Sequence, residues 1–256
     1  VAVLFGGRTK DGALLYDTWE WDGSAWTQVA TEASPHPNPL GALGYDAHRK
    51  KMLLFGGATG VGDTAEQTTV LDDTWEWDGA AKTWTRLDLA VSPSARADSL
   101  MAYDAHRRLL VLYGGDVSPD FDTVSGELND TWAFNGRAWI QQASYTPPLA
   151  RASPGLVYDS LRGAIFLWSG MDQAGAVPAV SPVSQTVWVL RRQADHAQWI
   201  ALETLGRPEG RVVAASYDRM RARSIFIVER PLSQGKARRF DTYTFDGQRF
   251  ELLAAD

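Results

Sequence analysis

The sequence contains no cysteine at all. Disulfide bonds, thiolate metal sites and cysteine nucleophiles are therefore excluded. Histidine is scarce too, with four residues that form no cluster of metal-ligand spacing. The glycine patterns that cradle phosphates, GxGxxG and GxxxxGK[ST], are absent, as are the GxSxG and HExxH motifs of hydrolases. We therefore expect no metal and no cofactor.

A long apolar run is also lacking. No stretch approaches eighteen consecutive apolar residues, so no membrane span is predicted. Basic residues number 25 against 31 acidic ones, and the net charge of −6 argues against a nucleic-acid partner. The chain starts at Val1 inside an apolar run, which we interpret as a cropped or processed start. Nothing in the sequence indicates a compartment, and we expect a monomeric domain.

What the sequence does contain is a repeat. An apolar run that ends in an aromatic residue and two glycines returns at intervals of about 50 to 60 residues. The copies are Phe5-Gly6-Gly7, Phe55-Gly56-Gly57, Tyr113-Gly114-Gly115, the decayed Trp168-Ser169-Gly170, and residues 225–230, which have lost both glycines.

Three further phrases accompany each copy. A Tyr-Asp pair precedes the last four runs, an Asp-Thr-Trp-type phrase follows the runs, and a single aromatic residue comes after that. Trp19 and Trp21 alternate with Glu20, which is the period-two pattern of a strand with one packed face. Asp-Gly or Asn-Gly pairs then favour tight hairpins. Four phrases in each unit predict four strands in each unit, and no helical periodicity competes with them.

Units of this length and content are typical of a β-propeller. The glycine doublet, the aromatic strand and the later Trp resemble the kelch repeat, whose structural superfamily includes the central domain of galactose oxidase. We predict an all-β fold, a single propeller domain over residues 1–256 with five four-stranded blades, the first lacking its first strand. That makes nineteen strands, in units at approximately 1–29, 34–87, 92–142, 147–202 and 207–253.

The eleven tryptophans are a candidate sugar platform, but their recurrence at one register favours packing between blades. Trp188 is the exception. We align Val187 with the tryptophans of the other units, so Trp188 is expected to point the other way, toward an exposed or ligand-facing position. The glycine doublets are expected where the backbone turns tightly and another segment passes closely.

A binding site is expected where the first strands begin, at the mouth of the central channel, on the face with the long variable loops. Three arginines share one register there, and guanidinium forks suit carboxylate or phosphate. The alternative is that the arginines brace neighbouring blades by bonding loop carbonyls or Asp98. The candidate ligand-binding residues are Arg96, Arg151, Arg211, Asn38, Asp98, Ser153 and Trp188.

The resemblance implies a binding or scaffold module for a protein or carbohydrate ligand, anionic in character. Kelch adaptors that recognise acidic peptides use arginines at this place. The alternative is a small carbohydrate-acid enzyme, such as a sialic-acid-mutarotase-like isomerase, at the same site. The copper-radical oxidases of this superfamily need a tyrosine crosslinked to cysteine, so the absence of cysteine excludes that activity. No residue is predicted to be catalytic.

Overall fold

A computed structural model covers the chain. It describes residues 1–11, 13–36, 40–59, 69–118, 126–144, 146–152, 154–172, 186–193, 196–230 and 239–255. The structure within these ranges is built from antiparallel β-sheets, and no helix occurs in them. No helix in the described ranges is therefore long and apolar enough to cross a membrane.

Five sheets make up the body of the molecule. The first has three strands, β1 (Ala2–Arg8), β2 (Leu14–Trp21) and β3 (Trp26–Val29), and each of the others has four. They are β4 (Ala42–Asp46), β5 (Lys51–Phe55), β8 (Thr74–Asp78) and β9 (Thr83–Leu87); β10 (Leu100–Asp104), β11 (Leu109–Tyr113), β12 (Thr131–Phe134) and β13 (Trp139–Gln142); β15 (Gly155–Asp159), β16 (Ala164–Trp168), β18 (Val187–Gln193) and β19 (His196–Leu202); and β20 (Arg211–Asp218), β21 (Arg223–Glu229), β22 (Phe240–Phe245) and β23 (Phe250–Ala255).

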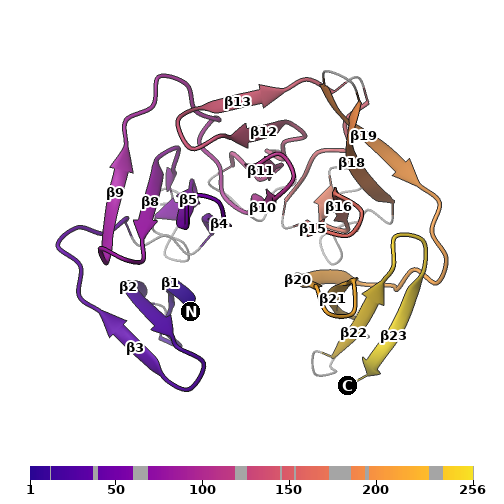
Figure 1. Cartoon of the computed structure of the whole chain (residues 1–256), viewed down its shortest axis with the longest axis horizontal. Helices are drawn as coiled ribbons and strands as arrows, with labels where there is room; N and C mark the ends of the chain where they lie inside the picture. The colour runs from indigo at the N-terminus through magenta and orange to yellow at the C-terminus, as the bar shows by residue number, and fades with distance from the viewer. Residues whose placement is uncertain are drawn as a thin grey trace.

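The five sheets stand around a common axis as the blades of a β-propeller (Figure 1). In blades two to five the first strand lies innermost in sheet order and the fourth outermost, whereas in blade one β1 takes the place of a second strand. The prediction of five blades, with an incomplete first blade, is confirmed. In the described part of the chain the nineteen expected blade strands are all present.

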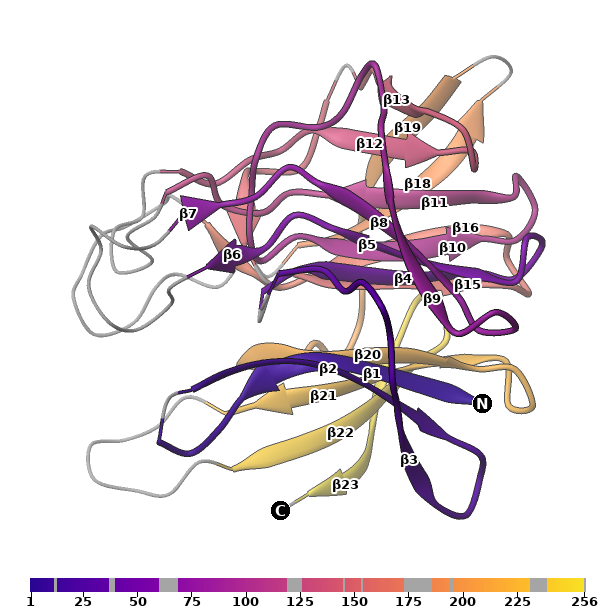
Figure 2. The same cartoon turned by 90° about the vertical axis from the view of Figure 1, so that its left-hand side faces the viewer.

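The two faces of the propeller differ in their connections. In Figure 2 the tight turns lie on one side of the molecule, and the segments with β6 (Ala58–Thr59) and β7 (Thr69–Val70) lie on the other. On that side β14 (Arg151–Ala152) also pairs with β17 (Met171–Asp172). Sequence analysis did not predict these four short strands, which extend the loops after the second strands and the segments that lead into the first strands.

The glycine doublets allow two pieces of backbone to meet on the loop face. Gly114 has φ +67° and Gly115 has φ +103°, and the N–H of Gly115 donates to the carbonyl oxygen of Arg151 at 3.0 Å. A Cβ atom at Gly114 would lie 2.5 Å from the same carbonyl oxygen, closer than any side chain tolerates. The doublet is therefore needed both for its left-handed backbone and for this contact, as the sequence predicts.

Adjacent blades are joined by one recurring aromatic contact. A Trp on the fourth strand of one blade packs on the aromatic residue that precedes the glycine doublet of the blade before it, with ring centroids 5.0–5.3 Å apart. Its indole N–H also donates to a buried Thr hydroxyl on that blade's third strand. The three donor–acceptor pairs are Trp84–Thr18 (2.9 Å), Trp139–Thr74 (3.1 Å) and Trp199–Thr131 (2.9 Å).

The junction between blades four and five uses the same positions with different chemistry. Phe250 replaces the Trp and packs on Trp168 with centroids 4.7 Å apart, and buried Val187 replaces the Thr. Donor and acceptor are therefore absent together, and neither partner is left buried without a hydrogen bond. Phe250 and Val187 thus keep the packing of this junction without its hydrogen bond.

Candidate functional site

A cavity of about 310 Å³ lies where the first strands begin. Its lining comes from residues 40–41, 98–100, 154–155 and 211–215, so blades two to five all contribute. This position is the channel mouth on the loop face, where sequence analysis expects a binding site. Asp98 and Arg211 are the two charged residues in the described lining, and Ser99 adds a buried hydroxyl.

Arg211 is the accessible cation of this cavity. It begins β20 directly opposite Glu229 on β21, and its Nη2 donates to Glu229 Oε2 at 2.8 Å. About 36% of its side chain stays exposed, which leaves part of the guanidinium edge open to solvent. A guanidinium held from one side by a carboxylate can still present N–H groups to a second anionic group.

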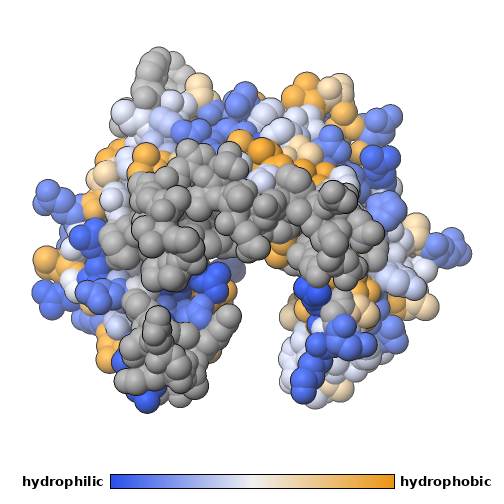
Figure 3. Space-filling model, turned by 180° about the vertical axis from the view of Figure 1, so that it is seen from behind, coloured by the Kyte–Doolittle hydropathy of each residue, from blue (hydrophilic) through white to orange (hydrophobic). Residues whose placement is uncertain are grey.

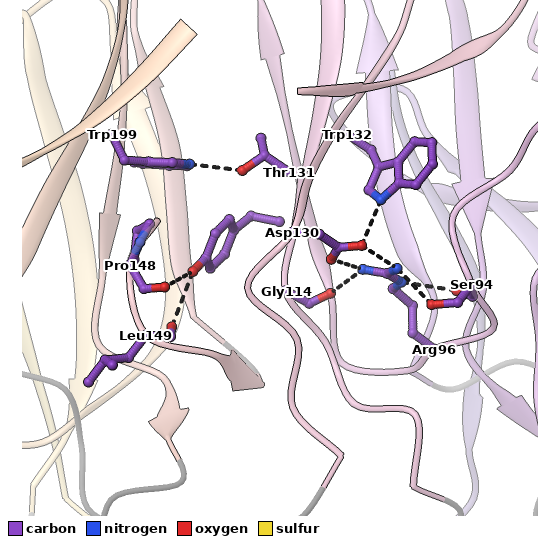
Figure 4. A network of polar contacts seen from close by, with 10 residues as sticks. Ser94, Arg96, Gly114, Asp130, Thr131, Trp132, Pro148, Leu149 and Trp199 are labelled. Atoms are coloured by element: carbon purple, nitrogen blue, oxygen red, sulfur yellow. Dashed lines mark hydrogen bonds and ion pairs between the residues drawn. The ribbon is translucent and has the colours of Figure 1, made fainter. Parts of the chain in front are cut away.

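Arg96 lies outside the cavity lining and is fully buried, and Figure 4 shows its polar contacts. Its Nη1 and Nη2 donate to the two oxygens of Asp130 at 2.5 and 2.9 Å. Nη1 also donates to the carbonyl of Gly114, and Nε and Nη2 donate to the carbonyl and hydroxyl of Ser94. All five guanidinium N–H groups are thus used within the protein.

Arg151 occupies the equivalent position one blade further on. It is fully buried as well, and its Nε and Nη1 donate to the carbonyls of Leu149 and Ser169 at 2.9 Å each. The phenol of Tyr113 lies nearby. It stays protonated, because burial raises the pKa of Tyr113 far above its ordinary value. In the structure the guanidinium groups of Arg96 and Arg151 therefore bond loop groups of their own blades. Bracing between blades and a ligand role for these two residues both remain predictions.

The other candidate residues are distributed differently. Asp98 lines the cavity with a left-handed backbone, φ +54°, and its N–H donates to the carbonyl of Leu40 at 3.0 Å. Asn38 and Ser153 lie outside the described residues. Asp98 and Arg211 are therefore the two sequence-predicted residues that the structure brings to the cavity lining.

The expected register of Trp188 is wrong by one residue. Trp188 lies opposite Leu167. Trp132 lies opposite Leu112 in the same way, and so do Trp75 opposite Leu54 and Trp19 opposite Leu4. Trp188 is therefore their counterpart, and it packs half-buried against the core of blades three and four. The alignment failed because Val187 stands where the other blades have Thr, so the neighbouring Thr186 was matched in its place.

An acidic pair lies near the mouth. Asp116 and Glu127 face each other across an isolated β-bridge, and both are buried. Burial raises the pKa of Asp116, and the charges of Glu127 and Asp98 raise it further, although the N–H of Ser118 donates to its carboxylate at 2.7 Å. Within the described ranges, no three His, Cys, Asp or Glu side chains are grouped to hold a metal ion.

Replacing Asp116 with Asn is expected to raise the free energy of unfolding at pH 7 by roughly 1 kcal/mol. The raised pKa means that the charged carboxylate destabilises the fold, a penalty that disappears as the pH falls through the folded-state pKa. The gain should therefore shrink as the pH approaches about 4. Urea unfolding at several pH values, with exposed Asp88→Asn as the charge-matched control, measures this. A gain of equal size at every pH would contradict the expectation.

Comparisons with known proteins find partial sequence relatives and a structural similarity over nearly the whole chain. No family model matches the chain. A plant protein from Arabidopsis thaliana, acyl-CoA-binding domain-containing protein 4, is 29% identical over 125 residues, which are 48% of this chain and 18% of that protein. The tRNA wybutosine-synthesizing protein 4 of Emericella nidulans is 29% identical over 136 residues, 52% of this chain and 12% of that protein. The matched segments therefore span less than a fifth of these relatives.

The solved structure of YjhT is similar over nearly the whole chain. The match covers 98% of this chain and 80% of YjhT, with a TM-score of 0.66 and 13% sequence identity. The chain is a β-propeller. At this identity the likeness concerns the fold alone.

Proposed function

We propose that this chain is a kelch-type binding module that holds an anionic group of a protein or glycan ligand at the channel mouth. The observation that carries the proposal is a cavity lined by residues of four blades, with one accessible guanidinium, that of Arg211, in its described lining. Arg96 and Arg151 lie outside the cavity lining and hold loop carbonyls of blades three and four. Recognition of a carboxylate by an arginine fork is the chemistry that this arrangement favours.

The second candidate is a carbohydrate-acid isomerase at the same place. An acid does lie beside Arg211, since Glu229 is 2.8 Å from its Nη2. Held in this salt bridge, Glu229 orients the arginine and is poorly placed to exchange protons with a substrate. A binding role is therefore favoured over an enzymatic one, and the two are separated by measuring turnover together with affinity.

The test is a titration of the protein with sialic acid and, separately, with a Glu-rich peptide, followed by NMR. Arg211→Gln is expected to weaken binding about tenfold or more, because a charged hydrogen bond to the ligand is lost. Arg219→Gln is the matched control, since this exposed arginine follows the opposite end of the same strand. Unchanged affinity in Arg211→Gln, or equal losses in both variants, would overturn the proposal. Catalysed exchange of the sialic-acid anomers would favour the isomerase instead.

A further inference from the structure

The charges at the channel mouth are unevenly distributed. Blade five contributes Arg211, and Glu229 already neutralises this guanidinium in a salt bridge at 2.8 Å. Blade three, which stands on the far side of blade four (Figure 1), contributes the carboxylate of Asp98 to the same lining. An anion bound at Arg211 therefore brings a further negative charge to a mouth whose described lining is not positive overall.

Two buried acids increase the negative charge on the blade-three side. Asp116 and Glu127 face each other across a β-bridge, and Ala97, which directly precedes Asp98, bridges to Asp116 from the other side. Burial raises the pKa of the Asp116 carboxyl most, and the negative charges of Glu127 and Asp98 raise it further. The three carboxyl groups are therefore close enough to repel one another, and a positive charge beside them would be stabilised.

The propeller fold does not require acids at this bridge. The equivalent bridge of blade two joins Ala58 and Val70, and Ala58 follows its glycine doublet directly, as Asp116 does. Ala58 is fully buried, so the same place in blade two is filled by an apolar side chain. The acidic pair of blade three is thus a local feature that packing alone does not explain.

Two polar atoms on this side have no hydrogen-bond partner within the described part of the chain. They are Oγ of Ser99, which is 2% exposed and belongs to the cavity lining, and Oε2 of Glu127. The other blades place Gly41, Pro154 and Val213 at the position of Ser99, and all three line the cavity. A buried polar group without a partner destabilises a fold, and a ligand in the cavity can supply the missing hydrogen bond to Ser99.

An organic cation matches these groups better than a metal ion does. In the described ranges no three His, Cys, Asp or Glu side chains are grouped to hold a metal. An ammonium group carries three N–H donors and pairs well with a carboxylate and a hydroxyl. Figure 3 shows the loop face on which the mouth opens, and hydrophilic residues border the hollow between its two lobes. A charged ligand therefore meets polar surface on its way to the mouth.

We propose that the channel mouth binds a zwitterionic group, in which a carboxylate and an ammonium are joined by a short apolar spacer. The inference rests on the proposed function for its anionic end at Arg211, and it adds Asp98 and Ser99 as acceptors for the ammonium. Leu100 and Val213, in the same lining, offer apolar contact to the spacer. With both charges on the ligand, the negative side of the mouth is compensated as well as the positive one.

The experiment compares small probes that differ in one charge. The 256-residue chain is titrated with 4-aminobutyrate and 6-aminohexanoate, with butyrate and hexanoate, which lack the ammonium, and with butylamine, which lacks the carboxylate. Binding is followed by NMR. At least one of the two amino acids is expected to bind about tenfold more tightly than the carboxylate of the same length, because a charged hydrogen bond is added.

Variants assign the gain to the blade-three side. Asp98→Asn should remove most of it, and the fold should be retained because Asn tolerates the left-handed backbone at φ +54°. Ser99→Ala should weaken binding of the amino acids by about threefold without lowering the free energy of unfolding, since the hydroxyl has no partner among the described residues. Exposed Asp88→Asn is the matched control and should leave every affinity unchanged.

The outcomes separate this inference from the proposed function. Equal affinities for amino acids and carboxylates, or a full gain kept in Asp98→Asn, would overturn the inference. If Arg211→Gln still weakens hexanoate binding in that case, the proposed function stands. Butylamine binding that is lost in Asp98→Asn and unaffected by Arg211→Gln supports the cationic end and counts against the proposed function. If none of the five probes binds, both proposals fail.

Discussion

Replacing Arg96 with Met is expected to lower the free energy of unfolding by about 3 kcal/mol. The guanidinium is fully buried and joins both oxygens of Asp130 to the backbone of two loops. Removing it leaves a carboxylate that is only partly exposed without its counter-charge. Urea denaturation followed by tryptophan fluorescence measures the loss.

Two further variants separate charge from geometry. Arg96→Lys keeps the charge but cannot supply the forked pair of hydrogen bonds. Its free energy of unfolding should therefore lie between those of Arg96→Met and the wild type. In Arg96→Met with Asp130→Leu the orphaned carboxylate is gone, and most of the lost stability should return. If the double variant lost as much free energy of unfolding as the two single variants added together, the ion pair would not be the source of the effect.

The loss caused by Arg96→Met should also depend on pH. Burial opposes ionisation of Asp130, but the hydrogen bonds and charge of Arg96 outweigh burial and hold the pKa of Asp130 below its ordinary value. A lowered pKa stabilises the fold above the unfolded-state pKa of about 3.9, and the contribution is lost as the pH falls through the folded-state value. The difference between wild type and Arg96→Met should therefore narrow below about pH 4. A constant difference would contradict the pairing.

Replacing Trp199 with Ala is expected to cost about 3–5 kcal/mol, because the indole fills the junction between blades three and four. It is buried, its ring lies 5.2 Å from that of Tyr113, and its N–H donates to Thr131. Trp199→Phe keeps most of the packing but leaves the Thr131 hydroxyl buried without its donor, at a cost of roughly 1–2 kcal/mol. Chemical denaturation of both variants gives the two values.

The chain contains its own control for this experiment. Phe250 and Val187 form the apolar version of the same contact between blades four and five. Trp199→Phe combined with Thr131→Val copies that pair and should recover about 1 kcal/mol relative to Trp199→Phe alone. No recovery would mean that the Trp–Thr hydrogen bond contributes little and that ring packing alone joins the blades.

The repeat made most of the fold predictable. Each phrase contains both a periodicity and a turn signal, so five units, nineteen blade strands and the incomplete first blade followed from the sequence. Trp188 was misplaced because a single substitution, Val187 for Thr, removed the landmark of its strand while Thr186 offered a false one. Strand pairing fixes register by hydrogen bonds across the sheet, and the residue pattern of one strand alone does not distinguish registers that differ by one residue.

The channel-mouth arginines show the limit of positional reasoning. The repeat assigns Arg96, Arg151 and Arg211 to one register, but of the three only Arg211 lines the cavity. It could not show which carboxylate each would meet, because Asp130 lies 34 residues after Arg96 while Arg211 pairs with Glu229 across its own hairpin. Burial also differs among them, since blades three and four are packed on both sides and blade five only on one. The direction and exposure of each arginine side chain depend on neighbouring residues that a repeat pattern does not specify.

The arrangement of the blades as an open arc is tested most directly by hydrogen exchange at assigned indole N–H groups. Trp84, Trp139 and Trp199 each donate to a buried Thr of the preceding blade, whereas the equivalent Trp26 is half-exposed. We expect the first three to exchange orders of magnitude more slowly than Trp26. Fast exchange of all four would contradict the packed junctions, and slow exchange of Trp26 would show that blade one is covered and the arc is closed.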